Sequence, residues 1–165
     1  MLELPPLSLY IHVPWCVRKC PYCDFNSHQV SGDLPEQDYL HALTHDLRQD
    51  LPYVQGRALQ SIFIGGGTPS LLSAAFYEQL LLVITNNFSL APDTEITLEA
   101  NPGTVEAGRF AEYRNLGINR LSLGIQSFND LALARLGRIH SAEDARKAID
   151  IAQGSGFDNF NLDIM

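Results

Sequence analysis

The chain alternates between short runs of β-forming residues and longer segments in which apolar residues recur every three or four positions. The β-forming runs predict strands near residues 7–13, 61–64, 95–100, 120–125 and 159–163. The segments between these runs have the spacing of amphipathic helices. Strands and helices that alternate in this way predict an α/β fold with a parallel sheet built of βαβ units.

Residues that favour element ends predict where several of these elements start and stop. Pro35 suits the first turn of a helix that follows a polar linker over residues 27–34. Ser73 and Thr104 are in position to cap two later helices. Residues 86–93, which include a proline, are expected to form a turn before the third strand.

The composition is that of a globular domain. The chain has 165 residues, 45% hydrophobic and 18% charged, which is enough for one domain with its own core. No apolar run approaches the roughly 18 residues of a membrane span. A formal net charge of −8 argues against a nucleic-acid partner held mainly through phosphates. Clustered cysteines without an export signal favour a cytoplasmic location.

All three cysteines of the chain, Cys16, Cys20 and Cys23, lie in one C-x3-C-x2-C stretch directly after the first predicted strand. A structural zinc ion takes four protein ligands, one more than these cysteines supply. A 4Fe–4S cluster bound by three thiolates keeps an open position on its fourth iron. The spacing therefore favours a cluster with a free iron site, where a cofactor or substrate can bind.

Other interpretations of the cysteine stretch stay open. His12, Asp24 or His28 could complete a zinc site, since mixed cysteine and histidine sets are common zinc ligands. Chance clustering is a weaker alternative, and a disulfide is disfavoured by the odd cysteine count. His41 and His45 are four residues apart, but without a third ligand nearby they are expected to lie on an exposed helix face.

Polar or flexible residues follow each of the other predicted strands. Glycines over residues 65–67 allow the backbone to approach a ligand closely. Glu99 could accept two ribose hydroxyls, Gln126 suits ribose or adenine, and Arg138 suits a carboxylate. Asp163 also lies near a strand end. Arg138 follows a predicted helix, whereas the cysteines, the glycines, Glu99, Gln126 and Asp163 all follow strands, which is typical of the active face of a β/α barrel.

The cysteine spacing, with Tyr22 before the last cysteine, resembles the signature of radical S-adenosylmethionine (SAM) enzymes. The string Tyr-x-His-x-Pro-Trp-Cys that begins at Tyr10 resembles the branch that holds oxygen-independent coproporphyrinogen III oxidase and the haem chaperone. Three later strings resemble motifs of the same family: Gly-Gly-Gly-Thr-Pro at 65–69, Gly-x-Gln-Ser-Phe at 124–128 and Asn-x-Asp-Ile at 161–164. The resemblance covers essentially the whole chain.

The resemblance implies a partial parallel β/α barrel of six units. This chain reaches only the fifth strand, so residues 1–165 are expected to be an incomplete radical SAM core domain, without the sixth strand and a C-terminal domain. The three cysteines would hold a 4Fe–4S cluster, and SAM would chelate the open iron. The residues that match the family's SAM contacts are Tyr10, Tyr22, Gly66, Gly67, Thr68, Glu99, Gln126, Arg138 and Asp163.

The chemistry implied by the resemblance begins with one electron from an external donor. That electron would cleave the C5′–S bond of SAM and release methionine and a 5′-deoxyadenosyl radical. The other implied partners are haem or a porphyrinogen, and respiratory haemoproteins that would receive haem. Haem-binding residues are expected beyond residue 165.

Two departures bear on the branch. Phe25 stands where coproporphyrinogen oxidases carry an extra cysteine. Those oxidases also carry a longer N-terminal segment before the position that matches Tyr10. Both features resemble the haem chaperone, which is therefore the favoured prediction. The alternative is an oxygen-independent coproporphyrinogen III oxidase, an oxidoreductase, so catalysis itself stays open. A zinc-binding interaction module without catalysis is the alternative of another class.

Overall fold

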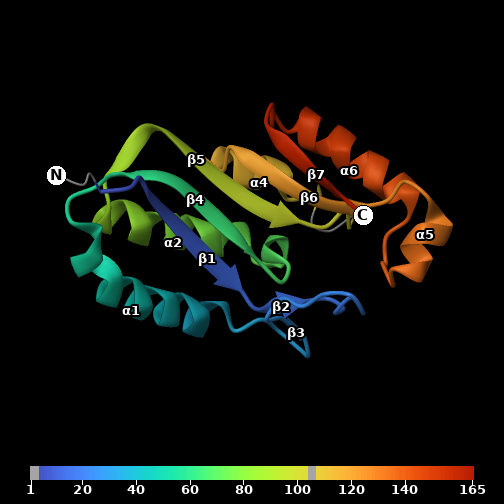
Figure 1. Ribbon diagram of the computed structural model, residues 1–165, viewed down its shortest axis with the longest axis horizontal. Helices are drawn as coiled ribbons and strands as arrows, with labels where there is room; N and C mark the ends of the chain where they lie inside the picture. The colour runs from blue at the N-terminus through green and yellow to red at the C-terminus, as the bar shows by residue number, and fades with distance from the viewer. Residues whose placement is uncertain (1–3, 104–106) are drawn as a thin grey trace.

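The computed structural model describes residues 4–103 and 107–165, and within them one five-stranded parallel sheet forms the centre of the fold (Figure 1). Its strands lie side by side in chain order: β1 (Leu7–Val13), β4 (Leu59–Gly66), β5 (Leu90–Ala100), β6 (Arg120–Gln126) and β7 (Phe160–Ile164). Each pair of neighbouring strands is parallel, so every connection brings the chain back to the end of the sheet at which the strands start. The predicted α/β fold, a partial parallel β/α barrel, is confirmed.

Helices cover one face of this sheet. They are α1 (Glu36–Val54), the 3₁₀ turn η1 (Pro69–Leu71), α2 (Ala74–Asn87), α4 (Phe110–Asn115), α5 (Asp130–Arg135) and α6 (Ala142–Gly154). Contacts join α1 to α2, α2 to α4, and α4 to α6, so these helices form a row behind the strands. The short helix α5 lies apart from this row, beside the end of the molecule where the strands point (Figure 1).

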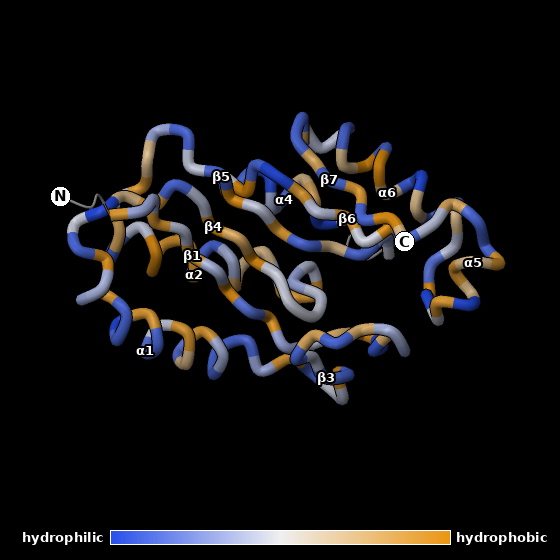
Figure 2. Tube along the Cα trace, in the orientation of Figure 1, coloured by the Kyte–Doolittle hydropathy of each residue, from blue (hydrophilic) through white to orange (hydrophobic). Residues whose placement is uncertain are grey.

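The two faces of the sheet differ in polarity because successive strand residues point to opposite sides. Ile64, Leu98 and Leu121 are fully buried and pack in one core with the helices. Thr97 and Ser122 lie between such residues and belong to the opposite, polar face. The alternation is visible along the strands in Figure 2. Parallel sheets usually bury both faces, so the polar face marks where this sheet has another role.

The predicted linker over residues 27–34 is not wholly irregular, which corrects the sequence analysis. It contains β3 (His28–Gln29), which pairs in parallel with β2 (Trp15–Cys16). Two backbone hydrogen bonds hold the pair, from the amide of His28 to the Pro14 oxygen at 2.7 Å and from Val30 to Cys16 at 2.8 Å. A strand of two residues has no periodicity, so it cannot be predicted from the pattern of apolar residues.

Other boundaries shifted slightly. Strand β5 begins at Leu90, inside the expected turn, and includes Pro92; the ladder with β4 is irregular at this point, which accommodates a residue without an N–H. Pro35 precedes the first turn of α1 instead of lying in it. Ser73 caps α2 as predicted, since its hydroxyl accepts the amide of Phe76 at 3.1 Å. The predicted cap at Thr104 lies outside the described residues.

The exit of β4 is fixed against the chain that leaves β1. The amide of Gly67 donates to the Val13 oxygen at 2.6 Å, and the amide of Thr68 donates to the Trp15 oxygen at 2.7 Å. A Cβ at Gly67 would lie 2.4 Å from the Trp15 oxygen, closer than real Cβ contacts allow. The loop that carries Cys16, Cys20 and Cys23, called the cysteine loop, therefore starts where only a glycine at position 67 lets the two backbone segments come this close.

We expect Gly67→Ala to lower the free energy of unfolding by about 1–3 kcal/mol, because the Trp15 backbone has to move. Urea unfolding followed by circular dichroism measures the change. Gly154→Ala, in the last turn of α6 with open space around its Cβ, is the matched control and should be neutral or stabilising. Equal stability of the two variants would contradict the close packing at Gly67.

Candidate functional site

One pocket opens at the carboxyl ends of the strands, on the side where β2 and the cysteine loop lie in Figure 1. The structure brings all the predicted site residues except Tyr10 to its wall. They are Cys16, Cys20, Tyr22, Cys23, Gly66, Gly67, Thr68, Glu99, Gln126, Arg138 and Asp163. They come from the cysteine loop, from the ends of four strands and, for Arg138, from the segment after α5, so residues far apart in the sequence meet at the end of the sheet where the strands terminate.

The three cysteines lie on one short loop and form no disulfide. Cys16 ends β2 and is buried, whereas Cys20 and Cys23 are half-buried. A turn brings the last two together, since the amide of Cys23 donates to the Cys20 oxygen at 3.1 Å. Lys19 stabilises the loop from within, because its ammonium donates to the Phe25 oxygen at 3.1 Å.

The zinc alternative requires three or more ligands around one ion. Within residues 4–103 and 107–165, no three His, Cys, Asp or Glu side chains are grouped in this way. Sulfurs bound to one tetrahedral zinc ion lie within roughly 4 Å of one another, given a Zn–S distance of about 2.3 Å. In a cluster each thiolate binds a different iron, so wider spacing is expected. His41 and His45 are exposed on α1, as expected.

The backbone amides of the glycine turn after β4 are all occupied within the protein. The amides of Gly66, Gly67 and Thr68 all donate within the protein, to Glu99, Val13 and Trp15 respectively. Gly66 also has φ +110, where a side chain would be strained. A ligand at this turn therefore meets acceptors more readily than donors, which suits an ammonium group.

Glu99 is a half-buried carboxylate at the end of β5. Its Oε2 accepts the amide of Gly66 at 3.0 Å. Burial raises the pKa of Glu99, the nearby negative Asp163 adds to the rise, and the Gly66 hydrogen bond opposes it. Gly65 leaves the space for this side chain, since a Cβ there would lie 3.0 Å from the same oxygen. The carboxylate is held in place at some electrostatic cost, with its second oxygen available to a ligand.

Gln126 ends β6 with a backbone φ of +65, in the left-handed region that non-glycine residues rarely adopt. The ladder with β7 is irregular between Leu123 and Gln126, and the Gln126 oxygen accepts the amide of Met165 at 2.9 Å. Such strain persists only where the surroundings impose it and is concentrated at functional sites. The sequence showed the residue at a strand end but gave no signal of its conformation.

Arg138 connects three parts of the pocket. Its Nη2 donates to the Asn101 Oδ1 at 2.6 Å and to the Gly124 oxygen at 2.7 Å, and its Nη1 lies 3.4 Å from the Cys20 sulfur. Asn101 in turn donates to the Thr68 hydroxyl at 3.0 Å. A Cβ at Gly124 would come within 3.3 Å of the guanidinium. Sequence analysis missed Asn101, because Asn-Pro-Gly after a strand is indistinguishable from an ordinary turn.

One nitrogen of this arginine remains available. Arg138 Nε is buried and has no hydrogen-bond partner among the described residues. A buried guanidinium N–H without a partner is costly, so a ligand acceptor at this point would be stabilising.

Burial, and the proximity of Cys20, raise the pKa of the neighbouring Tyr22, although the positive Arg138 opposes the rise. Tyr22 therefore stays a neutral aromatic residue beside the cysteines.

Of the last two predicted site residues, Asp163 lines the pocket and Tyr10 does not. Asp163 lies in the pocket wall, where Asn161 donates to its Oδ1 at 2.7 Å. Tyr10 is not among the residues that line this pocket, and its predicted SAM contact stays a prediction. It pairs in register with Phe63, before the ends of both strands, and 57% of its surface is exposed. Its hydroxyl is 2.9 Å from His12 Nδ1.

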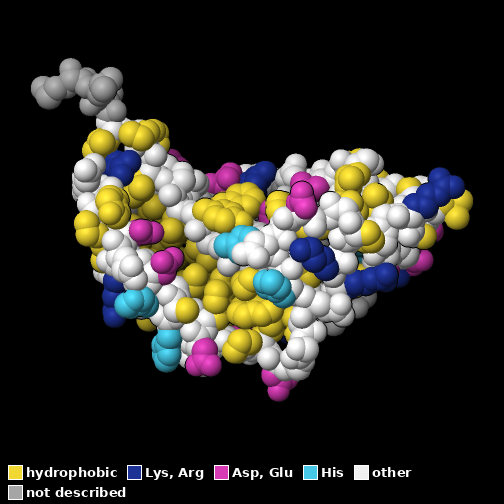
Figure 3. Space-filling model, turned by 60° about the horizontal axis from the view of Figure 1, so that its bottom comes forward, with side chains coloured by type: hydrophobic (Ala, Val, Ile, Leu, Met, Phe, Trp, Pro, Cys, Tyr) yellow, Lys and Arg dark blue, Asp and Glu magenta, His cyan; other side chains and the backbone are white. Residues whose placement is uncertain are grey.

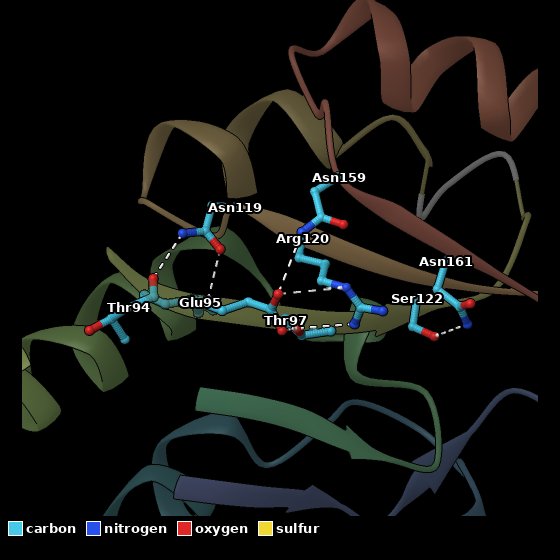
Figure 4. Close-up of polar contacts among 9 residues, drawn as sticks. Thr94, Glu95, Thr97, Asn119, Arg120, Ser122, Asn159 and Asn161 are labelled. Carbon is cyan, nitrogen blue, oxygen red and sulfur yellow. Dashed lines mark hydrogen bonds and ion pairs between the residues drawn. The ribbon is translucent and has the colours of Figure 1, made fainter. Parts of the chain in front are cut away.

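A second polar group lies below the pocket on the same face of the sheet. Figure 4 shows Glu95, Thr97 and Arg120 pointing toward one another from β5 and β6. Arg120 Nε lies 3.8 Å from Glu95 Oε2, and the Thr97 hydroxyl donates to Glu95 Oε1 at 3.1 Å. Asn159 reaches the same carboxylate at 3.4 Å. These groups satisfy one another, unlike Glu99, which is nearer the strand ends.

The chain matches the radical SAM superfamily over residues 10–165. The chain belongs to this superfamily. Membership implies a 4Fe–4S cluster and SAM, and therefore an electron donor. It accounts for three cysteines on one loop beside polar strand ends. Within the part of the chain that the structure describes, no helix is both long and apolar enough to span a membrane.

In two relatives, more than half of the residues aligned with this chain are identical to it. The heme chaperone HemW of Escherichia coli K12 is 56% identical over 165 residues, and that of Haemophilus influenzae is 59% identical over 169 residues. Each match covers 100% of this chain but 44% of the relative. The resemblance to the haem chaperone branch is confirmed, and the chain spans less than half the length of these proteins.

The same fold occurs in a solved structure of lower identity. Coproporphyrinogen III oxidase (HemN) from Escherichia coli, a radical SAM enzyme, superimposes with a TM-score of 0.86 at 32% identity. The match covers 96% of this chain and 37% of that chain. Thus both branches considered from the sequence share this core, and the higher identity is with the chaperones.

Glu99→Gln is expected to raise stability near neutral pH. The pKa of Glu99 is raised above its ordinary 4.5, so the folded state holds this proton more tightly than the unfolded state and loses stability as pH rises through that window. Glutamine removes this loss and can still accept the Gly66 amide. Thermal unfolding of the wild-type and variant proteins from pH 4 to pH 8 measures the effect.

Glu95→Gln is the matched control for this prediction. It lies on the same strand and face, but its carboxylate is paired with Arg120. Its replacement should therefore give no gain in stability. Of these two variants, only Glu99→Gln is expected to weaken SAM binding, because only Glu99 lines the pocket. The loss of charge-assisted hydrogen bonds should reduce the binding free energy by about 1.5–3 kcal/mol. A gain in stability from both variants would contradict the assigned cause.

Asn101→Ala should weaken SAM binding, because Arg138 loses one partner and Thr68 loses its donor. Asn101→Asp keeps an acceptor for Arg138 but has no N–H for Thr68, so it should retain more affinity than alanine. Isothermal titration with SAM measures both, and loss of one hydrogen bond corresponds to about a fivefold to tenfold change. Equal affinity of both variants and the wild-type protein would show that Asn101 does not position this site.

Proposed function

We propose that residues 1–165 are the radical SAM core domain of a haem chaperone. The observation that carries the proposal is the 56–59% identity, along the whole chain, to proteins named heme chaperones. The parts of such a protein beyond this core would supply the haem-binding residues. The partners would be haem, respiratory haemoproteins that receive it, and an external one-electron donor.

In this proposal Cys16, Cys20 and Cys23 hold the 4Fe–4S cluster. The support is that all three are free of disulfides and line one pocket, while the sequence contains no fourth cysteine. Three thiolates leave one iron open toward the same pocket. The residues present therefore fit a cluster that binds a further ligand.

The SAM site would use the remaining pocket residues. The carbonyls of the Gly66–Gly67–Thr68 turn suit the methionyl ammonium, and the free Nε of Arg138 suits the carboxylate. Glu99 would accept ribose hydroxyls, while Gln126, Asp163 and Tyr22 would bound the nucleoside. When bound, cluster and SAM supply one-electron cleavage of the C5′–S bond. The chain's own residues orient the cofactor and exclude water.

The alternative function is oxygen-independent coproporphyrinogen III oxidase. The TM-score of 0.86 to that enzyme favours it, because the two cores share one geometry. The chaperone is preferred because identity is higher to that branch and because Phe25 stands where the oxidases carry an additional cysteine. The residues of this core are compatible with both functions, so the chaperone and the oxidase are distinguished by what each does with haem or coproporphyrinogen III.

Replacement of any one of the three cysteines by alanine should remove the cluster. After anaerobic reconstitution, the wild-type protein should contain about four irons and four acid-labile sulfides, and the variants far less. His12→Ala is the matched control, since His12 belongs to the zinc alternative only; this variant should keep its iron. A cysteine variant with full iron content would refute the ligand assignment.

The two functions differ in what happens to a tetrapyrrole. The intact protein is mixed without oxygen with coproporphyrinogen III, SAM and a reductant, and separately with haem. Stoichiometric haem uptake, with no protoporphyrinogen formed, is the expected result. Formation of protoporphyrinogen would reject the chaperone in favour of the oxidase. Zinc in place of iron and sulfide in the purified protein would reject both.

A further inference from the structure

A second cavity lies against the outer side of the cysteine loop. This groove, called the outer groove, has a volume of about 340 Å³ and is bounded chiefly by Val17, Arg18, Cys20, Arg138, Ile139 and His140. Its surface is more apolar than polar. The proposed function assigns no ligand to this groove, which borders the cofactor pocket.

The outer groove and the cofactor pocket share a wall. Arg18, Cys20, Thr68, Asn101 and Arg138 line both cavities, so the retained response to SAM is a required control for variants at Arg18. Cys20, whose thiolate is proposed to hold the cluster, therefore also borders the outer groove. Electron transfer between proteins falls steeply with distance, so an electron carrier seated here would be separated from the cluster by about one residue.

The position of this wall is fixed by close packing. Gly137, at the end of α5, has φ +70, and a Cβ there would lie 2.8 Å from Pro21 of the cysteine loop. The loop thus rests directly on the backbone that follows α5. A partner that touches both sides of the groove would meet a preformed surface, which lowers the entropic cost of association.

The edge of the groove carries exposed aliphatic side chains. Val17 is 46% exposed and Ile139 is 61% exposed, and they stand on its two sides, one on the cysteine loop and one after α5. Exposed aliphatic residues beside a cleft that is itself apolar are typical of a protein contact. Electron-transfer complexes use small contacts, below about 1,200 Å² of total buried area, so a groove of this extent is sufficient.

The charge at the groove is opposite to that of the chain. The chain has a formal net charge of −8, yet the described residues that line the groove include Arg18 and Arg138 and no acidic residue. Arg18 is exposed and forms no ion pair with any part of residues 4–103 or 107–165. In the view of Figure 3, Lys and Arg side chains are visible at the surface on the right, with Asp and Glu side chains among them. Local positive charge steers an acidic partner to this point.

We infer that the outer groove is the docking surface for an acidic one-electron carrier protein. The inference rests on the proposed function, because it needs the cluster at Cys20. The step is a single electron transfer: the carrier is oxidised by one electron, the cluster is reduced by one, and no bond forms or breaks. Arg18 attracts the carrier, while Val17 and Ile139 contact its apolar centre.

The test uses the intact, reconstituted protein and an acidic flavodoxin reduced to its hydroquinone form. Anaerobic stopped-flow absorbance measures the second-order rate of cluster reduction at several ionic strengths. Ile139→Glu and Val17→Glu should each lower the rate about tenfold, because a carboxylate repels the carrier. Arg18→Gln should make the rate less dependent on salt.

Two exposed residues away from the groove serve as matched controls. Leu131→Glu on α5 and Arg48→Gln on α1 make the same changes outside the groove and should leave the rate near that of the wild-type protein. Dithionite, a small reductant that needs no docking surface, should reduce Ile139→Glu and wild-type clusters equally. The change that SAM causes in the electron paramagnetic resonance spectrum should also be retained.

The outcomes separate this inference from the proposed function. Groove variants that are reduced by flavodoxin as fast as the controls, with intact dithionite and SAM responses, would overturn the docking surface alone. Absence of a reducible cluster in the wild-type protein would overturn both. A rate lowered by both groove variants, with unchanged dithionite reduction, supports the inference.

Discussion

Two backbone hydrogen bonds join the glycine turn to the start of the cysteine loop, and the arrangement of the site depends on them. The amide of Gly67 donates to Val13, and that of Thr68 donates to Trp15. Both extend the contact between β1 and β4 beyond the sheet itself. Because the loop starts at this point, Cys16 is held above the strand ends, where Glu99 also lies. A side chain at Gly67 would prevent the approach.

The polar face of the sheet is stable where its groups pair and costly where they do not. Glu95 and Arg120 compensate each other, well before the strand ends. Nearer the pocket, burial raises the pKa of Glu99, and Gln126 has a left-handed backbone. Local preferences are violated at the residues proposed to contact the cofactor, a pattern expected where binding compensates for strain.

The strands and the meeting of their ends followed from the sequence, because β-forming runs alternate with helical spacing and parallel strands end at one edge. The details that failed depend on contacts between distant segments. Strand β3 exists only because β2 lies beside it. Asn101 resembles a turn residue until Arg138 and Thr68 are seen on either side of it. The family motif did not specify how far before the strand end Tyr10 lies, and its predicted SAM contact stays a prediction.

Arg138 is the point at which the two cavities influence each other. Its guanidinium contacts the Cys20 sulfur and is fixed by Asn101 and Gly124, while its Nε has no partner among residues 4–103 and 107–165. A cationic donor beside a cluster thiolate stabilises the reduced, more negative cluster and so raises its potential. If a cofactor carboxylate then binds at Nε, it neutralises part of that positive charge. In this proposal, electron entry from the outer groove and cofactor binding in the pocket would be coupled through the side chain of Arg138.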